Sequence, residues 1–155
     1  MSQALEGIKI IDLTRVLAGP YAAMILADMG ARVIHVEMPV TGDDSRGFGP
    51  SVNGESGYFM SINRNKEGIT LNMKSENGKK ILKKLIMDAD IVIENFKPGT
   101  MEKLGFGYDD IVKFKPDIIY AACSGFGQTG PYSKRPAYDA IVQAMGGIMS
   151  ITSPE

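Results

Sequence analysis

The sequence has no tryptophan, one cysteine (Cys123) and one histidine (His35) among its 155 residues. A single cysteine excludes an internal disulfide framework and is typical of a reducing compartment. Because Cys123 lies inside an apolar run, we expect it to be a small core residue. A single histidine argues against a histidine-rich metal site and against a Ser-His-Asp triad in this chain.

The chain also lacks an excess of either charge, with a formal net charge of -1. It therefore offers no basic field for nucleic acid and no polybasic membrane patch. No apolar run approaches the roughly 20 residues of a membrane span, and residues 1–6 lack the features of a signal peptide. We expect a soluble, cytoplasmic protein whose partners include neither nucleic acid nor a membrane.

Apolar and polar segments alternate along the chain in a β-α-β pattern. We expect strands over 8–13, 32–37, 69–73, 90–94 and 117–124, and helices over 21–29, 76–89, 99–104, 108–114 and 138–145. Residues 38–57 are rich in Gly, Pro, Asp and Ser and are predicted to form a long loop. The alternation predicts an α/β fold: one Rossmann-like domain over 1–155, with a mostly parallel sheet and helices on both faces.

The most informative segment is Ile91–Gly99, in which an apolar run stops at Glu94 and is followed by Asn95, Phe96 and Lys97. These three residues would lie at the carboxyl end of a buried strand, where open α/β sheets bind ligands. An amide, an aromatic ring and a cation suit a nucleotide-like ligand. The alternative is an ordinary strand-to-helix turn with a core Phe96 and a solvated Lys97.

Two further motifs admit more than one interpretation. The segment Asn63–Lys66 offers two amides and two cations, suited either to phosphate binding or to an exposed turn. The segment Gly125–Gly130 matches the G-x-G-x-x-G pattern of NAD-binding domains, with Glu37 as a candidate ribose-binding acid. Pro131 and Pro136 interrupt the helix that this pattern requires, which argues against NAD binding.

Taken in order, many segments resemble the class III CoA-transferase family of the CaiB/BaiF type, which includes formyl-CoA and carnitine CoA-transferases. The matching segments are 12–20, 30–37, 42–46, 58–59, 63–66, 69–74, 89–99, 124–128, 130–132 and 135–139. The resemblance covers the whole chain. It implies a transferase that moves CoA from an acyl-CoA donor to a carboxylic acid, with acyl-CoA as substrate and without metal or tightly bound cofactor.

The resemblance also implies which residues contact CoA. They are Leu17, Ala18, Leu71, Asn72, Met73, Lys74, Asn95, Phe96, Lys97, Lys103, Tyr138 and Asp139. Met38 and Pro136 stand where formyl-CoA transferase carries an arginine and a lysine, so two phosphate-directed charges are absent.

Family members attack the thioester with an aspartate that lies beyond the segment matched by residues 146–152, so no residue of this chain is assigned as nucleophile. We therefore expect an N-terminal CoA-binding portion, inactive alone, of an enzyme that forms an aspartyl-CoA thioester. The resemblance further implies an interlocked homodimer. The alternatives are a non-catalytic CoA-binding fragment and a related acyl-CoA racemase. The racemases carry a catalytic histidine where this chain has Tyr138.

Overall fold

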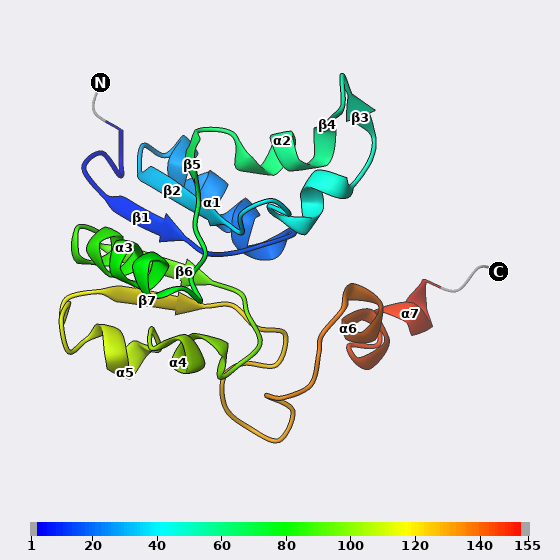
Figure 1. Cartoon of the computed structure of the whole chain (residues 1–155). Coiled ribbons are helices and arrows are strands. Elements are labelled where there is room, and N and C mark those ends of the chain that lie inside the picture. Colours follow the sequence, from blue (N-terminus) through cyan, green and yellow to red (C-terminus); the bar gives the residue numbers. More distant parts are fainter. Residues whose placement is uncertain (1–2, 153–155) are drawn as a thin grey trace.

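A five-stranded parallel sheet forms the centre of the molecule, as the computed structural model of residues 3–152 shows (Figure 1). The spatial order of its strands is β5 (Lys66–Thr70), β2 (Arg32–Glu37), β1 (Lys9–Asp12), β6 (Ile91–Glu94) and β7 (Ile119–Ala122). The chain runs outward from β1 to one edge and then returns to lay β6 on its other side. The strand order thus reverses between β1 and β6, and the expected parallel α/β fold is confirmed.

Helices cover both faces of the sheet, because successive strand residues point to opposite sides. On one face Ile10, Val33 and Ile93 pack with Ala23 and Ala27 of α1 (Ala18–Asp28). On the other face a larger core joins β1 and β6 to α3 (Glu76–Met87), α4 (Thr100–Leu104) and α5 (Tyr108–Ile111). Two apolar layers therefore hold the sheet.

Helix α3 follows the sequence prediction closely. The Ser75 hydroxyl caps it by accepting a hydrogen bond from the amide of Gly78 at 3.0 Å. Leu82 and Ile86 are fully buried, while Ile81 is 43% exposed. The buried residues of α3 therefore form a narrow stripe, because only one side of the helix meets the sheet.

The segment after β2 is more structured than the predicted loop over 38–57. It contains the 3-10 turn η1 (Asp44–Gly47), the hairpin of β3 (Ser51–Val52) and β4 (Glu55–Ser56), and the start of α2 (Gly57–Asn63). Asn53 and Gly54 form the hairpin turn, both with positive φ (52° and 84°). The hairpin was missed because its strands are only two residues long, although Asn-Gly is a strong turn signal.

Strand β5 begins and ends earlier than the predicted 69–73. It pairs with β2 only, and none of its five residues is fully buried. An edge strand of this kind lacks the continuous apolar pattern on which the prediction depended.

The C-terminal segment, residues 123–152, differs from the rest of the described chain. It carries α6 (Asp139–Met145) and α7 (Ile148–Ile151), which lie beside the sheet rather than over it (Figure 1). None of its residues is buried, and the prediction of a core Cys123 is wrong because that residue is exposed. Cys123 follows the edge strand β7, in which the side chain of Ile119 is also exposed to solvent.

Within residues 3–152, no helix combines the length and the apolarity needed to cross a membrane.

Candidate functional site

A pocket of about 470 Å³ opens at the carboxyl ends of the strands. It lies at the point where the strand order reverses, which is the usual ligand position in an open parallel sheet. Its lining residues are Leu13, Thr14, Arg15, Val36, Glu37, Met38, Pro39, Gly42, Asp43, Asn72, Met73, Lys74, Phe96, Thr100 and Leu104. Residues at or just after the ends of four strands, together with Thr100 and Leu104 of the helix α4, thus converge on one cavity.

Four of the residues expected to contact CoA line this pocket: Asn72, Met73, Lys74 and Phe96. Phe96 follows the end of β6, and Lys74 lies one short turn beyond the end of β5. Both residues are therefore at the carboxyl ends of strands. The pocket therefore brings together an aromatic ring and a cation from segments that are 22 positions apart in the chain, at residues 74 and 96.

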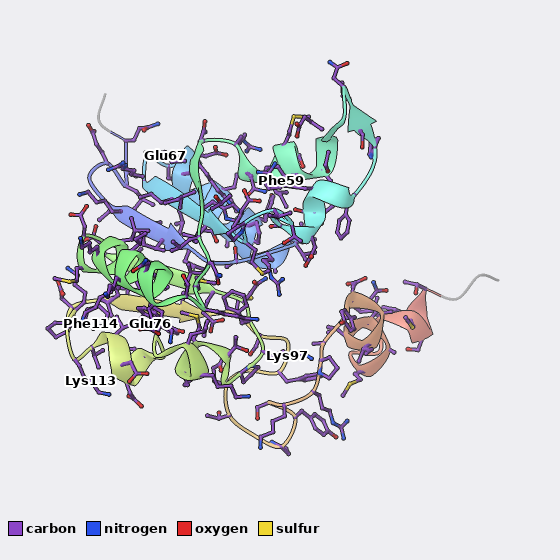
Figure 2. All side chains as sticks on the ribbon, viewed as in Figure 1. Phe59, Glu67, Glu76, Lys97, Lys113 and Phe114 are labelled. Carbon is purple, nitrogen blue, oxygen red and sulfur yellow. The ribbon has the colours of Figure 1, made fainter. Side chains whose placement is uncertain are left out.

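The remaining expected contacts lie around the pocket or away from it. Leu71 is buried in the core, and Asn95 sits beside the pocket without lining it. Exposed positions outside the lining are Leu17, Ala18, Lys97, Lys103, Tyr138 and Asp139. Figure 2 shows Lys97 at the end of the sheet where the strands finish, whereas Tyr138 and Asp139 belong to the start of α6.

The two carboxylates that line the pocket are already engaged. Glu37 receives two hydrogen bonds from Arg46, each of 2.7 Å, and a third of 2.9 Å from the amide of Asp43. The bond from Arg46 holds the pKa of Glu37 below its usual value. Asp43 is buried and accepts bonds from Ser45 and from the amide of Val16. Glu37 is thus used within the protein, so the ribose-binding role considered above has no support.

The cations of the lining are less engaged. Arg15 has one ion pair, a 3.5 Å contact with Asp44 in which the two side chains are 42% and 61% exposed. Lys74 has no ion pair with any residue between 3 and 152. With Glu37 neutralised by Arg46, the accessible charge of the pocket is positive and suits an anionic ligand.

Outside the pocket lining, a buried polar cluster of Asp12, His35 and Lys66 joins three neighbouring strands. One carboxylate oxygen of Asp12, Oδ2, lies 2.9 Å from Lys66 Nζ and 3.0 Å from His35 Nδ1. Burial opposes ionisation of Asp12, but the hydrogen bond and charge of His35 and the charge of Lys66 outweigh it and lower the pKa to about 2. Burial lowers the pKa of Lys66.

This cluster explains the Asn63–Lys66 motif. The three donors of the Lys66 ammonium go to Asp12, to the carbonyl of Pro20 and to the side chain of Asn63. Arg64 and Asn65 both bond to Asp28 on α1. The motif therefore fastens the α2–β5 turn to α1. None of its four residues lines the pocket, so phosphate binding there has no support. Lys66 is buried, so the motif is not a simple exposed turn either.

The G-x-G-x-x-G segment does not form a dinucleotide-binding turn. No helix begins between Gly125 and Tyr138, since α6 starts at Asp139. The amides of the segment therefore lack the helix N-terminus that would face a pyrophosphate.

The pocket residues that sequence analysis missed come chiefly from the turns after β1 and β2. Arg15 follows β1 as Asn95 follows β6, so the same carboxyl-end rule would have found it. Thr100 and Leu104 carried no such signal, because their approach to the pocket depends on how α4 packs against the sheet.

Comparison with known proteins agrees with this geometry. The family model "CoA-transferase family III" matches residues 5–155. Succinyl-CoA:glutarate CoA-transferase of Mus musculus is 55% identical over 97% of this chain and 35% of its own length. Acetyl-CoA:oxalate CoA-transferase of Acetobacter aceti is 52% identical over 95% of this chain and 38% of its own length.

Among solved structures, a CAIB/BAIF family protein from Brucella suis superposes with a TM-score of 0.93 and 43% identity. The match covers 99% of this chain and 42% of the Brucella chain. The chain thus spans between a third and a half of the length of these relatives. A family match over almost every residue, together with this superposition, shows that the chain belongs to CoA-transferase family III.

Proposed function

We propose that this chain is the N-terminal, acyl-CoA-binding part of a class III CoA-transferase, and that the pocket at the carboxyl ends of the strands holds the CoA moiety. The observation that carries the proposal is the pairing of Phe96 with two available cations, Arg15 and Lys74, in one pocket. An aromatic ring offers a face or wall to adenine, and the cations meet phosphate groups. Acyl-CoA is then a substrate and not a tightly bound cofactor.

The whole enzyme would move CoA from an acyl-CoA to a free carboxylic acid. Two of the relatives described above carry the names of dicarboxylic acids, glutarate and oxalate, as acceptors. We therefore propose a dicarboxylic acid as acceptor here too.

The chemistry proposed for the whole enzyme is covalent catalysis by an aspartate. The carboxylate attacks the thioester carbonyl and forms a mixed anhydride, releasing the CoA thiolate, which then attacks the aspartyl carbonyl to give the aspartyl-CoA thioester and the free donor acid. The two carboxylates in this pocket, Glu37 and Asp43, are committed to Arg46 and to backbone amides. Their role is to shape the pocket, and the nucleophile is expected from outside the pocket lining.

A homodimer is the proposed assembly, in a cytoplasmic protein. Support comes from α6 and α7, which expose a group of large apolar side chains: Ile141, Val142, Met145, Ile148, Met149 and Ile151. An apolar surface of this kind is typical of an interaction face. Light scattering should show a dimer or larger species, and a monodisperse monomer would contradict the proposal.

Calorimetric titration of the chain with CoA and with NAD tests the binding proposal. We expect heat of binding with CoA and none with NAD, and weaker CoA binding in Lys74→Met and Phe96→Ala. The matched control is Lys113→Met, a lysine on the surface after α5 and outside this pocket. Binding of NAD in place of CoA would refute the proposal, and transfer of labelled CoA to glutarate or oxalate would test the activity of the full-length enzyme.

A further inference from the structure

Both ends of the Asn95 side-chain amide form hydrogen bonds inside the protein. Its Nδ2 donates to the carbonyl oxygen of Arg15 at 2.7 Å, and its Oδ1 accepts from the amide of Arg15 at 2.8 Å. The two residues are 80 positions apart and follow the neighbouring strands β6 and β1. Asn95 thus clamps the backbone across the point where the strand order reverses. Asn95 does not itself line the pocket, whereas Arg15 does, so the side chain of Asn95 acts on the pocket through Arg15.

The clamp holds the backbone of Arg15 at the start of the turn after β1. With its backbone held, Arg15 places its guanidinium carbon 5.5 Å from the centre of the Phe96 ring, and it lines the pocket. Its contact with Asp44 is long, at 3.5 Å, and both side chains are more than 40% exposed. Such an ion pair contributes little, so the guanidinium is available to an incoming anion. Its planar set of donors matches a phosphate group.

The next residue is held as well. Val16 has a φ of 71°, a region that a β-branched residue rarely adopts. Its amide bonds to the buried carboxylate of Asp43 at 3.2 Å and 3.3 Å. The turn after β1 is therefore fixed from two sides, by Asn95 and by Asp43, in a conformation that it would not adopt alone. Preorganisation of this kind reduces the entropy cost of binding.

We propose that Arg15 binds a phosphate group of acyl-CoA, and that Asn95 is a positioning residue that acts through Arg15 and not a direct ligand contact. The inference rests on the proposed function, because it assumes that CoA occupies this pocket. The family resemblance implies that Asn95 contacts CoA directly, whereas the inference makes Asn95 a residue that positions Arg15.

The test measures binding of CoA and of pantetheine, which lacks the phosphates, by calorimetry. We expect Arg15→Met to weaken CoA binding about tenfold, the effect of one charged hydrogen bond, and to leave pantetheine unchanged. The matched control is Arg32→Met, which removes the same charge at the amino end of β2, far from the pocket lining. We expect it to bind both ligands as the wild type does.

Asn95→Ala should weaken CoA binding by about threefold to tenfold in the wild-type background and have no further effect in Arg15→Met. A purely structural role would weaken pantetheine equally. Thermal melts establish that each variant folds, and Arg15→Met tests the proposal even if Asn95→Ala does not.

Three results would overturn the inference. They are CoA binding of wild-type strength in Arg15→Met, equal losses for CoA and pantetheine, and a full additional loss when both substitutions are combined. A wild-type chain that binds no CoA would instead refute the proposed function, and the inference with it.

Discussion

The sheet region, residues 3–122, and the C-terminal segment, residues 123–152, are built on different principles. Every buried residue of the described chain belongs to the first region, and none to the second. The strands and helices of the sheet region bury one another's apolar faces. Helices α6 and α7 contact each other but leave their apolar side chains in solvent. The comparison shows that the first region has its own core, whereas the second needs another surface to bury its apolar residues.

Removing a negative charge should give the largest difference in stability loss between the sheet region and the C-terminal segment. Asp12→Asn leaves Lys66 and His35 without their carboxylate in a buried cluster, and we expect it to destabilise the protein by about 3–5 kcal/mol. The same substitution at Asp139 removes only an exposed hydrogen bond from Gln143, and we expect a loss under about 0.5 kcal/mol. Urea unfolding followed by circular dichroism measures both. Equal losses would contradict the distinction.

Truncation of an apolar side chain should also destabilise the protein more in the sheet region than in the C-terminal segment. Ile86 in α3 is fully buried, so Ile86→Ala should cost about 2–5 kcal/mol through lost burial and a cavity. Ile141 in α6 is 40% exposed, and Ile141→Ala should cost less than about 1 kcal/mol. If light scattering shows a dimer, the loss at Ile141 should grow with protein concentration, since α6 would then be covered.

Low pH should destabilise the sheet region through protonation of Asp12. Its pKa is lowered from 3.8 to about 2 in the folded protein, so the unfolded chain takes up its proton first. The stabilisation is complete above about pH 4 and is lost as the pH falls toward 2. It amounts to about 2 kcal/mol at 1.36 kcal/mol per pH unit. Unfolding free energies between pH 2 and 7 measure the total acid loss, which should be smaller by this amount in Asp12→Asn, where Glu37 and other carboxylates with lowered pKa still titrate.

The smallest expected effect concerns Glu94, which is buried and accepts one hydrogen bond, from the amide of Phe96 at 2.7 Å. Burial raises its pKa, and the charge of Glu102 adds to the shift. The charged form therefore opposes folding above the folded pKa, and this penalty disappears at lower pH. Glu94→Gln should stabilise the protein at pH 7 by up to about 1 kcal/mol and give no gain near pH 4. A loss of stability at pH 7 would show that Glu94 has a favourable partner.

The strand predicted most accurately is one that is buried between neighbours on both sides. Strand β2 was predicted with its observed bounds, because all but two of its residues are buried between neighbours on both sides. The edge strands were less well placed: β5 was shifted, and Cys123 after β7 was expected in the core. An apolar residue is buried only if another element covers it, and the pattern of one strand does not contain that information.

In the candidate site, too, some residues could be predicted from the sequence and some contacts could not. Asn95, Phe96 and Lys74 were named from the sequence, and two of them line the pocket. The bonds of Asn95 to Arg15 could not be predicted, since the two residues are 80 positions apart. The burial of Lys66 against Asp12, 54 positions away, was missed for the same reason.

The alternation of strands and helices, the family and the strand end that carries Phe96 can all be inferred from the order of residues, because they depend on local pattern and on ordered motifs. Which polar side chains stabilise the fold and which face the pocket is set by long-range contacts in the folded chain. A cation such as Lys66 or Arg15 has the same local chemistry in either role, and its role depends on which distant carboxylate or carbonyl the folded chain places beside it.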